Sequence, residues 1–213
     1  MKPFYRFAHI IVRAFLKCLY RLKVYGLENV QSSGAIIASS HVSFYDPPII
    51  AASWPQELHF LAREPLFHVP VLSFLIRHLN SHPVSGDQTD IKSFRTLCNL
   101  INSGKQVVIF PEGERSYDGE ILPMKNGVAM LALRCDAPIV PTYIHGAFEV
   151  WDRMKSLPKP WGHFTCVFGT PISPKSFASM PKKEAQLALS KKMGESIAAL
   201  KKWVEEGSKG TPP

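Results

Sequence analysis

The order of strand-like and helix-like segments constrains the fold of this chain more than any other feature. Short apolar runs alternate with longer segments whose apolar residues recur every three or four positions. This alternation predicts an α/β fold with a central, mostly parallel mixed sheet flanked by helices. The predicted strands are residues 23–25, 35–38, 59–62, 82–84, 106–110, 139–144 and 164–168, and the predicted helices are 46–53, 70–79, 90–102, 126–134 and 181–206.

A chain of 213 residues has room for one domain with an appendage. We expect an amphipathic helix of the membrane interface at residues 1–22, a compact domain at 23–207 and a disordered tail at 208–213. Gly207 is expected to end the last helix, because glycine readily takes the left-handed conformation that closes helices.

The N-terminal segment combines bulky apolar side chains with regularly spaced basic ones. Charges interrupt its apolar run too often for a membrane-spanning helix, which needs about 20 mostly uncharged residues. On a helical projection the basic residues share one arc and large apolar residues gather opposite them, as in helices that lie in a membrane interface. The alternative is a helix packed on the domain with a solvated basic face, but no acidic residue precedes Glu28, and solvated faces usually mix signs. The basic set is Lys2, Arg6, Arg13, Lys17 and Arg21, and the apolar set is Phe4, Ile11, Phe15, Cys18, Leu19 and Leu22.

The formal net charge of +8 indicates an anionic partner, for which nucleic acid, an anionic membrane and an acidic carrier protein are candidates. We expect no nucleic-acid partner, because the chain lacks a basic-aromatic strand motif and a recognition-helix signature. The cysteines form no Cys-x-x-Cys pair and have no histidine at zinc-ligand spacing, so we expect buried thiols and no metal site. They are Cys18, Cys98, Cys135 and Cys166.

His41 and Asp46 follow directly after the predicted strand at 35–38. Asp46-Pro47-Pro48 is typical of a helix start, so the carboxylate can either cap that helix or turn back onto the imidazole. A carboxylate bound to one ring nitrogen fixes the tautomer and leaves the other nitrogen free to accept a proton. No serine or cysteine stands in a nucleophile-elbow context, so we predict a general base that acts on a hydroxyl of the substrate.

Residues 110–116, Phe-Pro-Glu-Gly-Glu-Arg-Ser, follow another predicted buried strand. Gly113 permits a tight turn, Arg115 presents a planar fork suited to phosphate, and Ser116 adds a hydroxyl donor. The alternative is a surface turn with a local Glu–Arg pair. Because ligands bind at the carboxyl ends of strands in α/β sheets, we expect this segment and His41 to meet at one site.

Together these segments resemble four ordered blocks of the glycerolipid acyltransferase family, and most closely its bacterial 1-acyl-glycerol-3-phosphate acyltransferases. The first block is His-x4-Asp followed by proline, and the third is Phe-Pro-Glu-Gly-x-Arg-Ser. The second contains a basic residue, here Arg63, and the fourth is Ile-Val-Pro. The four blocks fall at residues 41–47, 60–67, 110–116 and 139–141, within a resemblance that covers roughly residues 20–175.

The resemblance implies a membrane-associated O-acyltransferase that moves a fatty acyl group from an acyl thioester to the free hydroxyl of 1-acyl-glycerol-3-phosphate (lysophosphatidic acid). The product would be phosphatidic acid, an intermediate of phospholipid biosynthesis. His41 would be the general base, held by Asp46. Acyl-CoA or acyl-acyl carrier protein would be the donor, membrane lipids would be partners, and no cofactor or metal would be needed. The location implied is the cytoplasmic face of a bacterial inner membrane, with peripheral or monotopic attachment. The implied substrate-binding residues are Arg63, Glu112, Gly113, Arg115, Ser116 and Pro141.

Two departures from the family pattern leave the acceptor open. Glu114 stands where threonine is usual, and residues 85–87, Ser-Gly-Asp, stand where many members carry an acidic residue and an arginine. Lys92 or Arg95 is a candidate to supply the absent positive charge. Glycerol-3-phosphate or another lysophospholipid is therefore an alternative acceptor, and a catalytically silent membrane-binding adaptor is the non-enzymatic alternative.

Overall fold

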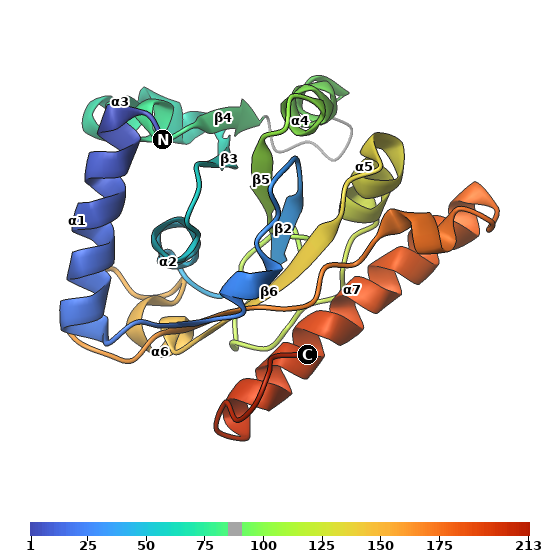
Figure 1. The fold of residues 1–213 in the computed structure, drawn as a ribbon. Coiled ribbons are helices and arrows are strands. Elements are labelled where there is room, and N and C mark those ends of the chain that lie inside the picture. The colour runs from blue at the N-terminus through green and yellow to red at the C-terminus, as the bar shows by residue number, and fades with distance from the viewer. Residues whose placement is uncertain (85–90) are drawn as a thin grey trace.

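The computed structural model describes residues 1–84 and 91–213 and shows one central sheet with helices on both sides (Figure 1). Within these residues seven strands pair in the order β1-β7-β6-β2-β5-β3-β4. Neighbouring strands run parallel except β6 and β7, so the predicted mostly parallel mixed sheet is confirmed. The strands are β1 (Lys23–Tyr25), β2 (Ile36–Ser39), β3 (Leu58–Arg63), β4 (Ser81–Val84), β5 (Gln106–Ile109), β6 (Ile139–His145) and β7 (Thr165–Phe168).

Two groups of helices cover the two faces of the sheet. Helices α1 and α2 lie on one face, where Leu16 and Ile49 are fully buried, and α4, α5 and α7 lie on the other, where Leu131 of α5 is buried. Successive side chains of a strand point to opposite faces, so Ile36 and Ile37 of β2 enter different cores. The helices are α1 (Pro3–Tyr20), α2 (Asp46–Ser53), α3 (Pro70–His78), α4 (Ile91–Asn102), α5 (Gly127–Cys135), α6 (Ala147–Trp151) and α7 (Lys182–Glu205), with 3₁₀ turns at Leu27–Asn29, Glu64–His68 and Pro174–Phe177.

Every strand predicted from the sequence overlaps an observed one, and the errors lie at the ends. Strand β3 extends one residue beyond the prediction at each end. Helix α6 was not predicted from the sequence, because a helix of five residues is too short to show an apolar period. The segment 85–87, where the family pattern is broken, and residue 90, predicted to begin a helix, lie outside the described residues.

Helix α1 packs on the domain with one side and leaves its main apolar side uncovered. Tyr5, Leu16 and Tyr20 are buried, and the guanidinium of Arg13 donates to the carbonyl oxygen of Ala52 (3.1 Å) at the end of α2. None of the described helices is long and apolar enough to cross a membrane. The large apolar residues on the uncovered side, which are 43% to 64% exposed, are Phe7, Ile10, Ile11, Phe15 and Leu19.

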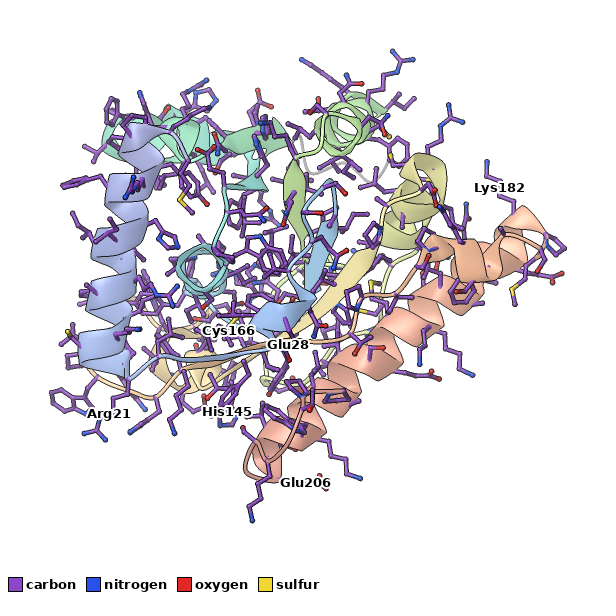
Figure 2. The ribbon with its side chains drawn as sticks, viewed as in Figure 1. Arg21, Glu28, His145, Cys166, Lys182 and Glu206 are labelled. Carbon is purple, nitrogen blue, oxygen red and sulfur yellow. The ribbon has the colours of Figure 1, made fainter. Side chains whose placement is uncertain are left out.

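The long helix α7 crosses one face of the sheet, and Figure 2 shows Lys182 and Glu206 near its opposite ends. Gly207 follows with a φ of 95°, as predicted for the residue that closes the helix. Beyond it the chain runs back to the sheet, where the backbone N–H of Thr170 donates to the carbonyl oxygen of Pro213 (3.1 Å). The disordered tail stays a prediction.

The cysteines differ in exposure more than the sequence analysis expected. Cys166 on β7 is buried (Figure 2), and Cys98 and Cys135 are half-buried. Cys18 is exposed, so the prediction of a buried thiol is wrong at this position. The reason is that Cys18 lies on a side of α1 that none of the described elements covers.

A histidine pair between β3 and β4, in which His59 is buried and His82 is half-buried, leads us to predict that the domain loses stability in acid. His59 Nδ1 lies 3.0 Å from His82 Nε2. Burial lowers the pKa of His59 to about 4, helped by positive charge at His82, Lys105 and Lys2 and opposed by Glu57. Between pH 6.5 and 4 the unfolded chain binds a proton that the folded chain does not. The free energy of unfolding should therefore fall as the pH decreases through this range, by roughly 3 kcal/mol.

Urea unfolding of the wild type and of His59→Phe across this pH range tests the prediction. The variant should show a flatter pH dependence, because its side chain at this position does not titrate. An unchanged pH dependence in the variant would mean that other groups cause the acid loss.

Candidate active site

His41 lies just beyond the carboxyl end of β2, beside the point where β5 ends. Its side chain is 18% exposed, which leaves part of the ring accessible from solvent. The ring stacks on Phe110, with centroids 3.9 Å apart and an interplanar angle of 17°. Strands β2 and β5 are parallel neighbours, so the two segments singled out in the sequence meet at one edge of the sheet.

Asp46, the first residue of α2, is fully buried and organises the turn that carries His41. Its Oδ2 accepts hydrogen bonds from His41 Nδ1 (2.7 Å), Val42 N (2.7 Å) and Ser43 N (2.8 Å). The two backbone donors fix the carboxylate, and the carboxylate fixes the imidazole. Because Nδ1 faces Asp46, Nε2 is the ring nitrogen left to exchange a proton with a ligand.

Glu112 connects the two segments through backbone hydrogen bonds. Its Oε1 accepts from His41 N (3.0 Å) and its Oε2 from Leu122 N (3.2 Å), and the residue is almost fully buried. The pKa of this carboxyl is raised to about 7. Burial is the main cause and the charge of Asp46 adds to it, while the two N–H donors act in the opposite direction. The N–H of Ser116 also donates to the carbonyl oxygen of His41 (2.9 Å). The backbone of His41 is therefore held from both sides by residues 112–116.

Arg115 is a half-buried cation close to other cations. Its Cζ lies 3.5 Å from the centre of the Phe44 ring. The pKa of Arg115 lies below its ordinary value because burial disfavours its charge and because Arg153 and Arg63 repel it, while Asp46 attracts it. Its Nη1 is buried and has no hydrogen-bond partner within the described part of the chain. A partly buried cation with an unused donor is suited to binding an anion.

The remaining predicted substrate-binding residues differ in their access to solvent. Arg63 ends β3 and is exposed, and Gly113 is exposed in a turn with a φ of 78° that favours glycine. Ser116 is fully buried, and its hydroxyl donates to Asp118 Oδ1 (2.8 Å). Pro141 is buried inside β6. The structure thus presents Arg63 and Gly113 at the surface and holds Ser116 and Pro141 in the interior.

Helix α6 and the turn after it, which the sequence analysis passed over, contact both halves of the site. The carbonyl oxygen of Trp151 accepts from Ser43 Oγ (2.6 Å) and from Phe44 N (3.4 Å). Arg153 Nη1 donates to the carbonyl oxygen of Arg115 (2.8 Å). The position of this segment in the chain could have indicated its role. It follows β6, whose carboxyl end lies at the same edge of the sheet as that of β2.

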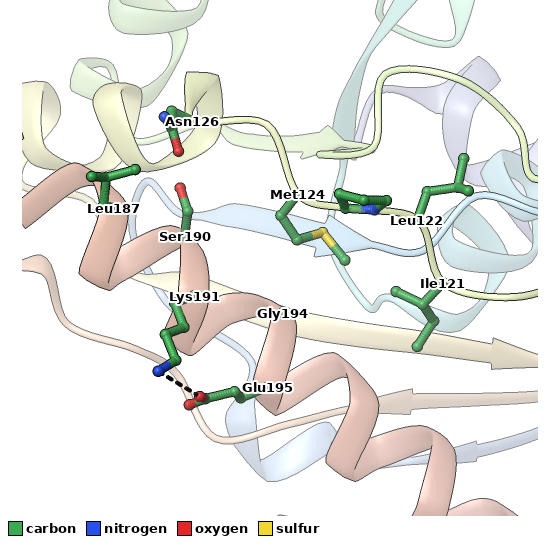
Figure 3. A pocket seen from close by; sticks show the side chains of 10 residues that line it. Ile121, Leu122, Met124, Asn126, Leu187, Ser190, Lys191, Gly194 and Glu195 are labelled. Carbon is green, nitrogen blue, oxygen red and sulfur yellow. Dashed lines mark ion pairs between the residues drawn. The ribbon is translucent and has the colours of Figure 1, made fainter.

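A cavity of about 470 Å³ lies between α7 and the loop that follows the Glu112 turn (Figure 3). Met124 of the loop and Leu187 of α7 face it from its two sides. Leu122 also lines it and binds Glu112 through its backbone N–H. The cavity therefore borders the loop that supports the site, while His41 is not among the residues that line it.

The fold and the site define a class of enzyme in which a histidine–aspartate pair and neighbouring arginines lie at the carboxyl ends of parallel strands. The chain belongs to the Acyltransferase family, whose sequence model matches residues 21–145. The matched region contains both the His41–Asp46 pair and the turn with Glu112 and Arg115.

The most informative relatives carry one shared activity in their names. The 1-acyl-sn-glycerol-3-phosphate acyltransferase of Bacillus subtilis is 26% identical over 95% of this chain and 99% of its own length. A chloroplastic enzyme of the same name from Brassica napus is 27% identical over 68% of this chain, but the match spans only 44% of that longer protein. The crystal structure of the 1-acyl-sn-glycerophosphate (LPA) acyltransferase from Thermotoga maritima superimposes with a TM-score of 0.75 at 26% identity, over 92% of this chain and 79% of that one.

Proposed function

We propose that this chain acylates the free hydroxyl of 1-acyl-glycerol-3-phosphate with an acyl thioester and so produces phosphatidic acid for phospholipid biosynthesis. The observation that carries the proposal is the contact of 2.7 Å between His41 Nδ1 and Asp46 Oδ2, at the same sheet edge as Arg115. The names of the relatives that match along most of the chain support this choice of acceptor.

In the proposed reaction His41 acts first as a base and then as an acid. Its Nε2 takes the proton of the acceptor hydroxyl while the hydroxyl oxygen attacks the thioester carbonyl carbon. The tetrahedral intermediate then collapses, the carbon–sulfur bond breaks, and the leaving thiolate takes the proton from the imidazolium. Asp46 stabilises the imidazolium and keeps the ring in place. One acyl group moves from sulfur to oxygen and one proton moves from oxygen to sulfur.

Charge is the basis for assigning the phosphate-binding residues of the acceptor site and for expecting an acidic acyl donor. Arg115, with its unused buried donor, would bind the phosphate of the acceptor, and Arg63 would lie close by. Glu112 would position His41 instead of touching the substrate, because both of its oxygens accept backbone N–H groups. Acyl-CoA and acyl carrier protein are both acidic, so either suits a chain with a net charge of +8.

Attachment to the cytoplasmic face of a bacterial inner membrane would occur through an apolar surface formed by α1 and α3. Phe4 of α1 meets Phe74 of α3 with ring centroids 6.0 Å apart, so the two helices adjoin (Figure 1). Arg6 and Lys17 are exposed on α1 and would contact anionic headgroups. We call this the α1–α3 surface, and its exposed apolar residues are Phe7, Ile10, Ile11, Phe15, Leu19, Val71, Phe74 and Leu75.

Replacing both Phe7 and Phe15 by serine should weaken binding to vesicles that contain anionic phospholipid by at least about tenfold. Burying one phenylalanine contributes about 1.5 to 3 kcal/mol, and these two are 64% and 43% exposed in the free protein. Co-sedimentation with the vesicles measures the effect. Leu187→Ser is the matched control, because Leu187 is 52% exposed on α7, away from the α1–α3 surface. Equal binding by the double variant and the wild type would exclude this surface as the attachment site.

A turnover assay separates the proposed function from its alternatives. The purified protein would be offered acyl-CoA or acyl-acyl carrier protein, each with lysophosphatidic acid, glycerol-3-phosphate or another lysophospholipid. We expect the highest kcat/KM with lysophosphatidic acid. A preference for glycerol-3-phosphate would correct the acceptor, and vesicle binding without turnover of any pair would favour the silent adaptor.

A further inference from the structure

Arg153 lies at the edge of the site, in the turn after α6 and outside the four sequence blocks. Asp152 shapes this turn, because its Oδ1 accepts the backbone N–H groups of Met154 (2.7 Å) and Lys155 (3.2 Å). The side chain of Arg153 is 25% exposed and directs Nη1 to the carbonyl oxygen of Arg115 (2.8 Å). The guanidinium of Arg153 therefore contacts the backbone of Arg115, a residue 38 positions away in the sequence, and its charge acts on the Arg115 guanidinium.

We propose that Arg153 is a second phosphate-binding residue of the acceptor site and acts together with Arg115. The inference rests on the proposed function, because it assigns a ligand to the same site. It also identifies a source for the positive charge that the family pattern places after β4 and that residues 85–87 do not supply.

The charges around Arg153 support this assignment. Arg115 and Arg153 are like charges in a partly buried place, an arrangement that an anion between them would stabilise. Arg153 carries five N–H donors, and its hydrogen bond to the Arg115 carbonyl leaves others available. Its ion-pair partner is Glu114, at 3.6 Å, whose side chain is 52% exposed. We infer that this carboxylate occupies Arg153 in the free protein and gives way when a phosphate binds.

The surroundings hold Arg153 in a fixed position relative to the base. Its Cζ lies 3.6 Å from the centre of the Tyr117 ring, which orients the guanidinium plane. The same segment holds the turn of His41, because the carbonyl oxygen of Trp151 accepts from Ser43 Oγ (2.6 Å). A phosphate bound by Arg153 would thus be placed by the segment that also places His41, which is what orienting a hydroxyl toward a base requires.

Steady-state kinetics of Arg153→Gln with lysophosphatidic acid test the inference. We expect the KM for lysophosphatidic acid to rise about 10- to 100-fold, because charge-assisted hydrogen bonds are lost, while the KM for the acyl donor stays unchanged. Arg153→Lys should recover part of the affinity, since it restores the charge but not the planar fork. Turnover of monoacylglycerol, which has no phosphate, should fall less in Arg153→Gln than turnover of lysophosphatidic acid does. Lys159→Gln, an exposed change of equal charge on the same segment, should leave the KM for lysophosphatidic acid within about twofold.

Glu114→Gln separates phosphate binding from a purely structural ion pair. If Arg153 binds phosphate, removing its competing carboxylate should lower the KM for lysophosphatidic acid by about two- to fivefold. If the ion pair only holds the turn, Glu114→Gln should raise this KM as Arg153→Gln does, and the inference would be overturned.

The failure of the inference is distinguishable from failure of the proposed function. An unchanged KM in Arg153→Gln, with wild-type turnover of lysophosphatidic acid intact, would refute the role of Arg153 alone. If the wild type did not turn over lysophosphatidic acid, the proposed function would fail. Calorimetric titration of wild type and Arg153→Gln with glycerol-3-phosphate would then decide whether Arg153 binds phosphate, with equal affinities counting against it.

Discussion

Replacing His41 by alanine should lower kcat by about 10³- to 10⁴-fold, the full contribution expected of a general base. The variant loses Nε2, the ring nitrogen proposed to take the acceptor's proton, while Asp46 keeps its two backbone donors at Val42 and Ser43. The turn should therefore stay folded. Steady-state turnover with lysophosphatidic acid measures the loss, and circular dichroism with vesicle binding checks that the fold and the α1–α3 surface are intact. A variant that kept a tenth of the wild-type kcat would refute the mechanism.

Asp46→Asn provides the companion measurement, because it removes charge without removing the hydrogen-bond acceptor. Two backbone N–H groups already point at Oδ2, so the asparagine should place its carbonyl oxygen there and its amide nitrogen at the site of Oδ1. Within the described residues Oδ1 has no hydrogen-bond partner, so nothing there opposes the amide. The His41 tautomer should be preserved, and kcat should fall by about 10- to 100-fold through loss of imidazolium stabilisation alone. A loss equal to that of His41→Ala would mean that the charge is as important as the base.

Glu112→Gln should lower kcat by about 10- to 100-fold and the free energy of unfolding by about 1 to 3 kcal/mol. The carboxylate serves two backbone donors, His41 N and Leu122 N, with one oxygen each. Glutamine has a single acceptor oxygen, so one buried N–H would face the amide NH₂ group and lose its partner. If the backbone N–H of His41 is the one that loses its acceptor, the imidazole shifts relative to the substrate. A shift of about one ångström is costly to catalysis.

Two measurements distinguish this positioning role from direct substrate binding. The KM for lysophosphatidic acid should stay near the wild-type value while kcat falls, and urea unfolding should show the loss of stability. Glu120→Gln is the matched control, because Glu120 is an exposed carboxylate whose ion pair with Lys201 lies at the surface and contributes little. A rise in KM with unchanged kcat would indicate that Glu112 touches the substrate after all.

The candidate site was predictable wherever its contacts are local in the sequence. The Asp46 carboxylate reaches His41, Val42 and Ser43 within one turn, so the spacing and the helix start at Asp46 were enough to propose the pair. Contacts between distant segments were not predictable in the same way. The family resemblance implies a substrate-binding role for Glu112, and this role stays a prediction. The sequence did not indicate that the oxygens of Glu112 accept the backbone N–H groups of residue 41, 71 positions away, and of Leu122.

The burial of individual side chains could likewise not be predicted from the sequence patterns. Ser116 has a hydroxyl suited to an anion, yet the fold encloses it and directs it to Asp118. The projection of α1 separated basic from apolar residues but did not show which side meets the domain. In the structure Arg13 contacts α2, while Phe7 and Phe15 remain exposed, because the packing of α1 on its neighbours decides its rotation.

By itself the sequence determined the α/β layers, the seven strands and the His41–Asp46 pair, because apolar periodicity and short-range turns act between residues close along the chain. The tertiary structure decided the rest of the site. The order of the strands places β2 between β5 and β6, which brings Glu112 to His41 and Arg153 to Arg115. Strand order is set by packing across the whole sheet, and so the contact between Arg153 and Arg115 emerges only once the chain is folded.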